Sequence, residues 1–365
     1  MFNVIFYMSI IPLPYYTSIY YTFLLFIITG SYLKVRRQRL HFDGRSNALI
    51  LLVIIVLYMG LRPISGRYFG DMDTYNRYFE YYSRGGGIIG AKDILWHLFM
   101  KMCSNILNAK SFFLLCSVLY VTPLYIACKK WFGKELYIPF LMFIASFSFW
   151  GYGTNGIRNG IATSLVVLAF SYGHKEKIKS LLLLVITFFI HSSIIIPSIA
   201  YLITFFYKKP KYYVRGWLLC IPLSLLLGGF WENFFASFGF DDRTGYLTEG
   251  NVNDVSFAYT GFRWDFLLYS ATAIYAGYFF SIKKKFKDNT YLRLFSIYAT
   301  SNAFWVLVIR ANFSNRFAYL SWFMMAIVIF YPFLKQQFFK NQPKVLGTVI
   351  LLYFGFTYIM YILTS

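Results

Sequence analysis

The chain has 365 residues, of which 58% are hydrophobic and 23% aromatic but only 13% charged, and its mean hydropathy is +0.55. These values exclude a water-soluble globular domain and indicate an integral membrane protein. The formal net charge of +21 would favour nucleic acid as a partner in a soluble protein, so its distribution along the chain decides what it means.

The basic residues are concentrated in alternate loops. Six segments hold 23 of the 35 Lys and Arg with only four acids, and they are KVRRQR with Arg45, KKWFGK, KEKIK, YKKPKYYVR, KKKFKDNTYLR and KQQFFKNQPK. The positive-inside rule predicts that these segments are cytoplasmic. The intervening segments hold 12 basic and 10 acidic residues. The charge therefore indicates topology, and no nucleic-acid partner is expected.

Taken in chain order, apolar runs between these segments predict an all-α, polytopic membrane helical bundle of about 10–12 transmembrane or re-entrant helices in a single transmembrane domain over 1–365. The opening MFNVIFYMSIIPLPYY lacks a basic n-region and a cleavage site, so no signal peptide is expected, and residues 2–14 are either an external arm or an extension of the first helix. Helices are predicted at about 15–33, 46–62, 111–128, 135–151, 157–172, 214–230, 264–282, 291–309, 317–334 and 345–363.

The first external loop is predicted at about 63–110 and contains two amphipathic segments. From Asp73 to Arg84, charged residues fall on one helical stripe and aromatic residues, including Tyr75, on the opposite one. The charged stripe is either a solvated face with i,i+4 ion pairs or part of a binding surface. Asp71 and Arg67 lie in a glycine-containing turn beside the membrane, where Asp71 is either a helix cap or a functional acid. In the second segment, His97 is predicted on the polar side with a structural role.

Two arginines in the outward-facing segments share a local pattern. Arg158 follows Asn155 in GTNGIRNGIATSL, and Arg316 follows Ser314 and Asn315 in ANFSNRFAYLSW. Each is predicted in the first turn of a helix, capped by Asn or Ser, where the N–H groups already favour an anion. Arginine suits phosphate or carboxylate, so both are candidate anion ligands, with headgroup contact as the alternative. Arg67 and Arg310 are further candidates.

The stretch LLLLVITFFIHSSIIIPSIAYLITFFYKK has cytoplasmic charge signatures at both ends. About 27 residues make ~40 Å of helix, which is too long for one span and too short for two. We therefore expect two short paired or re-entrant helices at about 180–207 that meet at His191. Irregular backbone at membrane depth must be covered by protein or line a wet cavity. His191 is either a functional residue or a turn cap.

The second external loop, at about 231–263, is polar and aromatic and suits sugars. Its acids Asp241, Asp242 and Asp254 lack the pattern of a calcium loop, so no metal site is expected. The four cysteines lack CxxC spacing and are predicted to pack between helices. The sequence contains no Walker A, GxGxxG, HExxH or GxSxG motif, so no cofactor is expected and any reaction needs an activated substrate.

Three segments in this order resemble the EpsG-like branch of the bacterial Wzy polysaccharide polymerases. They are MGLRP followed by FGDMDTYNRYFEYY and DILWHLF, then NGIRNGIATSLVVLAF through FFIHSSIIIPSIAYLI, then NRFAYLSWF. The resemblance covers about residues 50–335, and its most specific parts are N-x-x-R-x-x-I-A at Asn155 and H-x-S at His191. One departure concerns Lys92, Asp93 and Ile94, because many relatives have Glu-Pro or Asp-Pro there.

The resemblance implies a glycosyltransferase of the bacterial inner membrane whose site faces the periplasm. Such an enzyme polymerises undecaprenyl-pyrophosphate-linked oligosaccharide units, needs neither metal nor nucleotide, and works with membrane lipid, a flippase and a chain-length regulator. Positive charge at Arg158, Arg316, Arg310 and Arg67 would neutralise the leaving pyrophosphate. A base would take the proton of the acceptor hydroxyl.

His191 is the first candidate for this base, Asp71 the second and Asp73 a weaker third. Asp73, Asn155 and Tyr75 are also candidate substrate contacts. Two alternatives stay open, a transporter or flippase of lipid-linked sugars and an acyltransferase that modifies surface polysaccharide. The transporter is less favoured because no internal repeat is evident.

Overall fold

The computed structural model describes residues 11–37, 42–89, 92–173, 176–207, 209–238, 261–311 and 314–364, and every regular element in these ranges is a helix. The metal candidates Asp241, Asp242 and Asp254 and most of the predicted N-terminal arm lie outside them. The first half contains α1 (Tyr16–Arg36), α2 (Arg45–Gly60), α3 (Gly66–Phe69), α4 (Met72–Ser83), α5 (Ile94–Ser104), α6 (Ala109–Phe132), α7 (Tyr137–Ile144), α8 (Phe149–Thr154) and α9 (Ile157–Tyr172).

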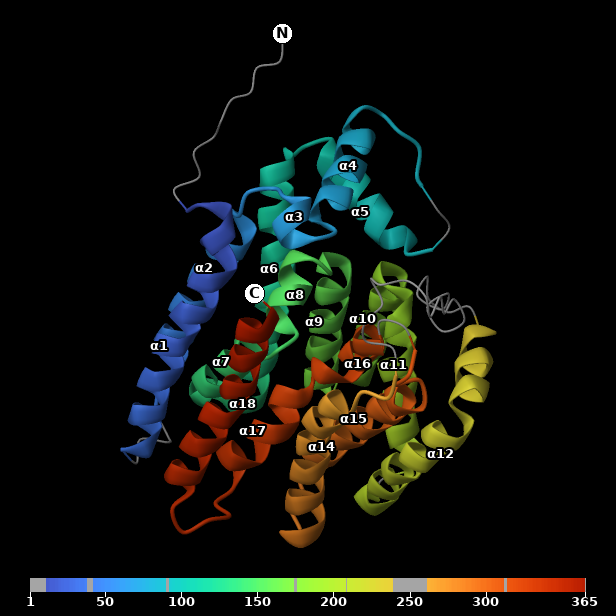
Figure 1. The fold of residues 1–365 in the computed structure, drawn as a ribbon. Coiled ribbons are helices and arrows are strands. Elements are labelled where there is room, and N and C mark those ends of the chain that lie inside the picture. Colours follow the sequence, from blue (N-terminus) through green and yellow to red (C-terminus); the bar gives the residue numbers. More distant parts are fainter. Residues whose placement is uncertain are drawn as a thin grey trace.

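The second half completes the bundle (Figure 1). It contains α10 (Lys177–Ile190), α11 (Ile195–Phe206), α12 (Pro210–Ala236), α14 (Trp264–Tyr278), α15 (Asn289–Leu307), α16 (Ser314–Trp322), α17 (Met325–Lys335) and α18 (Gln342–Thr364). Among the described residues, five helical segments are long and apolar enough to cross a membrane, namely Leu13–Arg36, Ala109–Glu135, Pro210–Ala236, Ser314–Lys335 and Gln342–Leu363. Shorter apolar helices lie beside them, so the protein is a polytopic helical membrane protein.

Two predicted helices are interrupted. The run predicted at 135–151 forms α7 and α8, separated by residues 145–148, where the Ser146 hydroxyl donates to the carbonyl of Phe143. The run predicted at 317–334 forms α16 and α17, separated by residues 323 and 324. The prediction of one continuous helix at 135–151 was wrong, because a serine hydroxyl and neighbouring helices satisfy backbone groups that a lone helix would have to pair internally. The span predicted at 317–334 lies within the membrane-length segment Ser314–Lys335, which has a short turn inside it.

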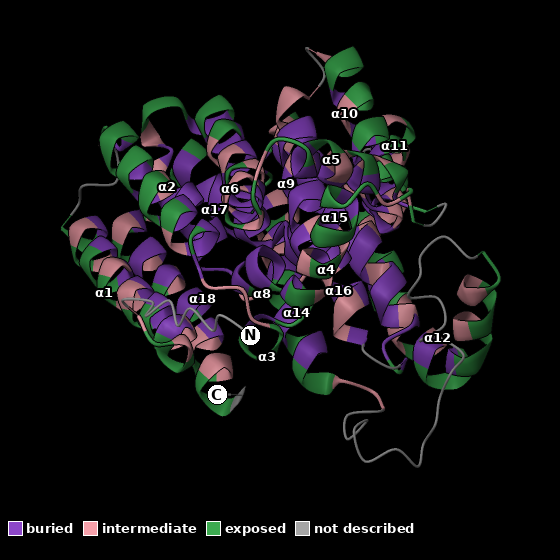
Figure 2. Ribbon diagram, turned by 90° about the horizontal axis from the view of Figure 1, so that it is seen from above, coloured by how far each residue is buried: buried purple, intermediate pink, exposed green. Residues whose placement is uncertain are grey.

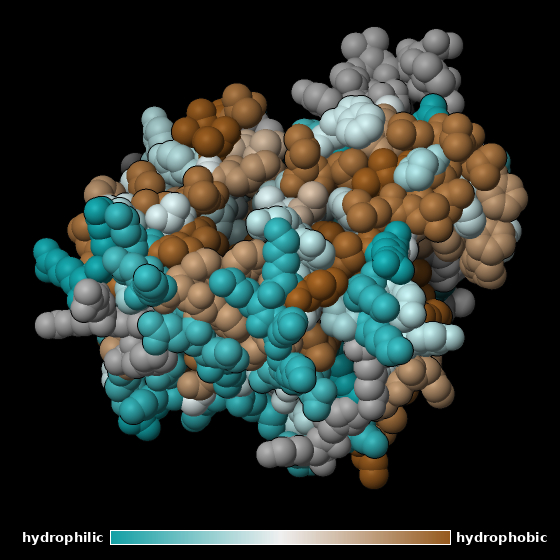
Figure 3. Space-filling model, turned by 90° about the horizontal axis from the view of Figure 1, so that it is seen from below, coloured by the Kyte–Doolittle hydropathy of each residue, from teal (hydrophilic) through white to brown (hydrophobic). Residues whose placement is uncertain are grey.

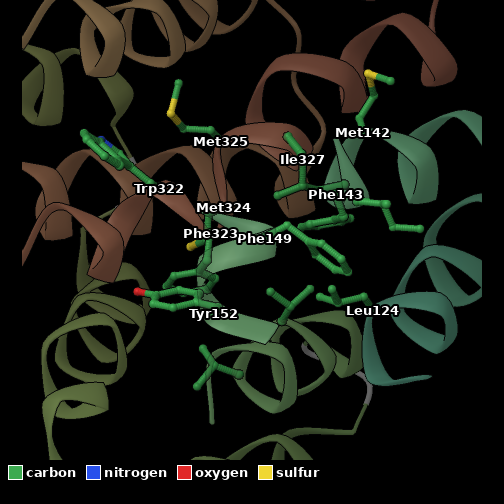
Figure 4. Close-up of a cluster of buried hydrophobic side chains, with 14 of the residues drawn as sticks. Leu124, Met142, Phe143, Phe149, Tyr152, Trp322, Phe323, Met324, Met325 and Ile327 are labelled. Carbon is green, nitrogen blue, oxygen red and sulfur yellow. The ribbon is translucent and has the colours of Figure 1, made fainter. Parts of the chain in front are cut away.

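The interrupted helices form the centre of the bundle. Figure 2 shows buried residues concentrated there, with exposed positions on the outward faces of α1 and α12. Figure 4 shows Phe143, Phe149, Tyr152, Phe323 and Met324 pointing toward one another in this centre. Since lipid is as apolar as these side chains, close packing rather than transfer from water stabilises their contacts.

A polar network joins four helices inside this core. Asn302 of α15 donates to Ser270 of α14 at 3.1 Å and to Ser321 of α16 at 2.9 Å, and its carbonyl accepts from the Trp217 indole of α12 at 2.7 Å. The Trp322 indole donates to the same Ser270 hydroxyl at 2.7 Å. Interhelical hydrogen bonds of this kind contribute ~0.6 kcal/mol each and fix the helices in register.

Contacts among the lysine-rich loops place them at one end of the bundle. The amide of Gly44 donates to the Lys134 carbonyl at 2.8 Å, and Lys130 pairs with Glu176 at 3.2 Å. Lys335 donates to the Trp131 carbonyl. Figure 3 views the molecule from this side and shows hydrophilic side chains gathered over part of the face. We call this the basic end and the other the opposite end.

Candidate active site at the opposite end of the bundle

Asp93 is the centre of the candidate site. It directly precedes α5 and has a left-handed backbone conformation, with φ 52° and ψ 39°. This conformation is uncommon for a residue other than glycine and often marks a functional constraint. Its carbonyl accepts the amide N–H groups of Trp96 and His97, which start the helix, while its side chain is turned inward and 1% exposed.

The Asp93 carboxylate contacts three groups from two other helical segments. Its Oδ2 lies 2.8 Å from a guanidinium nitrogen of Arg158 and 3.2 Å from Nδ1 of His191. Its Oδ1 accepts the backbone N–H of Ser192 at 2.8 Å. The sequence separations are 98 residues to His191 and 99 to Ser192. The three contacts bring together residues of α5, α9 and the α10–α11 junction.

The junction exists because the helix ends at His191. This residue is extended, with φ −154° and ψ 113°, and Ser192–Ile194 form a short 3-10 turn before α11. The Ser180 hydroxyl lies 3.2 Å from the Tyr201 hydroxyl, so α11 folds back alongside α10. An interrupted helix exposes N–H groups that must be satisfied inside a membrane protein. Asp93 accepts one of them at Ser192.

Electrostatics favour an ionised Asp93. Burial by itself raises the pKa of this carboxyl group, but the hydrogen bond and charge of His191, the charge of Arg158 and the Ser192 N–H together outweigh burial and hold the pKa below its usual range. His191 is completely buried. The Arg158 side chain is 22% exposed, so a ligand approaching from outside meets Arg158 before it meets His191.

A helical cap formed by α4 and α5 carries Asp93 (Figure 1). The Tyr82 hydroxyl lies 2.9 Å from Nδ1 of His97 and accepts the N–H of Ile89 at 3.2 Å. His97 is buried, which corrects its predicted place on the polar side of the helix, because the imidazole packs against Tyr82 and Tyr78 of α4. These contacts fix the segment that leads to Asp93.

Asn155 links the cap to the helix of Arg158. Its Oδ1 accepts the backbone N–H of Asp71 at 2.8 Å. The predicted Asn cap on α9 is therefore wrong, since Gly156 is the N-cap residue and Asn155 pairs across to the Asp71 turn instead. Gly70 has φ +55°, and a Cβ there would lie 2.5 Å from the Asn155 Oδ1. Only glycine allows this close approach.

Arg62 supports the same region from below. Its guanidinium donates to the carbonyls of Met59 and, at 3.1 Å, Thr154, and it lies 5.5 Å from the Phe69 ring centroid. Burial lowers the pKa of Arg62 to about 10, so it stays charged at neutral pH. Arg62 thus joins the ends of α2 and α8 beneath α3.

The other predicted residues take different positions. Asp71 is exposed in the turn before α4, and Arg67 is exposed in α3. Asp73 is also exposed and pairs with Arg77 at 3.3 Å, as expected of a solvated i,i+4 pair. Tyr75 is buried with its ring 5.5 Å from Trp96. Tyr75 therefore packs between α4 and α5, and its role as a glycan contact stays a prediction.

Arg310 and Arg316 lie at the end of α15 and at the start of α16. Arg310 is exposed after α15, and its side chain packs over Gly228 of α12, close enough to Glu232 for their charges to interact. Arg316 is half-buried in the first turn of α16. The role of both arginines as anion ligands stays a prediction.

Sequence analysis missed Asp93 and Arg62 as site residues. The signal for Asp93 was its position at the start of DILWHLF, where a turn acid is part of the family resemblance, but the absence of proline obscured it. No local signal pairs it with residues 65 and 98 positions away.

Among the described residues, no group of three or more His, Cys, Asp and Glu is arranged to hold a metal ion. The cysteines Cys103, Cys116 and Cys128 are buried thiols.

Comparison with known families decides the identity of the chain. The model of the EpsG family matches residues 47–365, which include Asp93, Arg158 and His191. The chain belongs to the EpsG family. Comparisons with curated proteins and with solved structures find no match. Membership in the EpsG family points to a membrane protein with a polysaccharide polymerase-like function, and the match confirms the resemblance seen in the sequence.

Proposed function

We propose that this EpsG-family protein polymerises lipid-linked oligosaccharide repeat units. It transfers the growing glycan from undecaprenyl pyrophosphate to the non-reducing sugar of the next lipid-linked unit, at the periplasmic face of a bacterial inner membrane. The family supports this class of reaction. The observation that carries the site is the Asp93 carboxylate, which contacts both His191 and Arg158 at the end opposite the basic loops.

In the proposed reaction, the acceptor hydroxyl oxygen attacks the anomeric carbon of the donor glycan. The bond from that carbon to the pyrophosphate oxygen breaks, and the pyrophosphate leaves with the electron pair. Arg158 is placed to stabilise this charge, because its guanidinium is partly exposed and held at a defined position by Asp93. Arg316, Arg310 and Arg67 supply further positive charge along the path of the lipid pyrophosphate.

The acceptor proton is assigned to His191. Asp93 contacts Nδ1, an arrangement that orients the ring and favours the imidazolium formed when the other nitrogen, Nε2, takes a proton. Because His191 is buried, this role requires the surrounding helices to open enough for the acceptor to reach Nε2 while Asp93 keeps its contacts with Nδ1 and with Arg158. Asp71 is the second candidate base, since it is exposed and its turn is hydrogen-bonded to Asn155.

Partners follow from this reaction. The substrates are membrane lipids that a flippase delivers, and a chain-length regulator is a further proposed partner. Neither metal nor nucleotide enters the scheme, because arginines carry the charge role and the pyrophosphate bond activates the donor.

The proposal is tested with purified protein in liposomes that contain lipid-linked repeat units but no nucleotide, ion gradient or acyl donor. We expect wild type to make a ladder of longer glycans, and Arg158→Ala and His191→Gln at equal protein level to leave single units. The exposed variant Arg77→Ala, on the solvated face of α4, should keep the ladder. Unextended units with wild-type protein would contradict the polymerase function, and a full ladder with His191→Gln would move the base role to Asp71.

A further inference from the structure

A long apolar groove runs along the membrane-facing side of α14, α17 and α18. Its volume is about 1000 Å³, at the upper end of the ~300–1,000 Å³ typical of ligand pockets. Helices α14 and α18 form the walls, and α17 lies between them (Figure 1), contributing Ile329 and Phe333. Eight of the 17 lining residues are Phe or Tyr.

The groove is longer than one leaflet of a bilayer. Its lining extends from Asp265, at the opposite end, to Phe280 near the basic end. These residues are 15 positions apart, so the groove is ~20 Å long at ~1.5 Å per residue. One leaflet of a ~30 Å hydrocarbon core is ~15 Å thick. A phospholipid acyl chain stays in its own leaflet, whereas a long polyprenyl chain crosses the midplane.

At the end near Asp265, ring contacts link the wall of the groove to the region of the candidate active site. There the walls meet where the Tyr269 ring stacks on Phe356 with centroids 4.0 Å apart. From Tyr269, ring contacts continue to Trp322 at 5.1 Å, from Trp322 to Tyr319 at 5.4 Å, and from Tyr319 to Tyr152 at 5.1 Å. Tyr152 is in α8, which ends just before Asn155, and Arg158 follows in the first turn of α9.

We infer that this groove binds the polyprenyl chain of the lipid-linked substrate and so sets the position of its pyrophosphate relative to Arg158. The inference rests on the proposed function for the identity of the lipid. The apolar, aromatic lining matches an unsaturated hydrocarbon, the length exceeds the thickness of one leaflet, and the ring contacts connect the groove to the α8–α9 turn.

Photolabelling tests the groove without requiring polymerisation. The probe is undecaprenyl phosphate with a diazirine in its chain, added to the full-length protein in liposomes. We expect labelled peptides from α14 and α18, with labelling suppressed by excess undecaprenyl phosphate but not by phosphatidylglycerol or by ten-carbon geranyl phosphate. Equal suppression by phosphatidylglycerol would show an ordinary annular lipid and overturn the inference, as would labelling confined to other helices.

Groove-filling variants supply the second measurement. Thr272→Trp projects a large ring into the groove from an exposed position, and Ala276→Leu is a milder change on the same wall. The matched control is Leu226→Trp on the exposed face of α12, 80% exposed. We expect the groove variants to reduce labelling at least fivefold and the control to leave it unchanged.

The kinetic consequence separates this inference from the proposed function. With undecaprenyl-linked donor, Thr272→Trp should raise KM at least fivefold, while KM for a geranyl-linked donor stays as in wild type. Equal effects on both donors would overturn the groove assignment but leave polymerisation intact. If the probe labels the groove of wild-type protein but that protein extends no glycan, the proposed function would be contradicted and the lipid site would be supported.

Discussion

Replacing Asp93 tests whether one carboxylate organises the candidate site. Asp93→Ala removes the acceptor for Arg158, His191 and the Ser192 N–H together. Breaking a buried ion pair from one side costs ~3–5 kcal/mol, and hydrogen bonds to charged groups contribute ~1.5–3 kcal/mol each. Because Arg158 is partly exposed, we expect a loss near the lower limit, about 3 kcal/mol of unfolding free energy. Asp93→Asn, which keeps an acceptor for Ser192, should lose about 2 kcal/mol.

The assay is reversible unfolding in mixed micelles, with Asp73→Asn as the matched control. Asp73 pairs with Arg77 at 3.3 Å, but its side chain is 52% exposed, and such surface pairs contribute ~0–1 kcal/mol. A double-mutant cycle of Asp93→Asn with Arg158→Gln should give a coupling energy above ~1 kcal/mol. If the Asp93 and Asp73 variants lose equal stability, or if the cycle shows no coupling, the carboxylate does not hold the site as the structure indicates.

Three further perturbations are expected to act on the same region. The pKa of Asp93 is lower than the ~3.9 of an unfolded chain, so its stabilisation is complete above that pH and is lost as the pH falls through the lower folded-state pKa. The difference in unfolding free energy between wild type and Asp93→Asn should therefore shrink below pH ~4, and a constant difference would contradict this. Arg62→Met should lower stability by ~2–3 kcal/mol, since the carbonyls of Met59 and Thr154 lose a charged donor; a change under 0.5 kcal/mol in the same unfolding assay would refute the role of Arg62. Gly70→Ala should destabilise the protein more than Gly85→Ala, because both residues have positive φ but only a Cβ at residue 70 would meet Asn155. Equal melting temperatures of the two variants would contradict a close contact between residue 70 and Asn155.

The sequence predicted the architecture well where the bilayer dictates it. Basic loops alternate with apolar runs because helices must cross a hydrocarbon layer of fixed thickness and basic residues stay on one side. The predicted span at 157–172 coincides with α9. The interruptions at 145–148 and 323–324 could not be predicted, because they depend on which neighbouring helix supplies a partner for each freed backbone group.

Part of the site was also predictable from the membrane context. His191 and Arg158 stand out because each is polar within an apolar context, and the structure brings both to one carboxylate. The burial of Tyr75 could not be predicted, because helical periodicity shows which residues share a stripe but not which stripe faces the protein. The pairing of Asp93 with His191 required the tertiary fold.

Residue 94 allows a test of whether the left-handed conformation of Asp93 is required for the site. Many relatives have an acid followed by proline at this point, whereas this chain has Ile94. Proline is well tolerated at the first position of a helix, but it drives the preceding residue toward an extended conformation, and Asp93 is left-handed. We therefore expect Ile94→Pro to displace the carboxylate, to cost ~1–3 kcal/mol and to abolish the glycan ladder, whereas Ile94→Ala keeps it. If Ile94→Pro retains both stability and the ladder, the left-handed backbone of Asp93 is not required, and an extended Asp93 must reach His191 and Arg158 equally well.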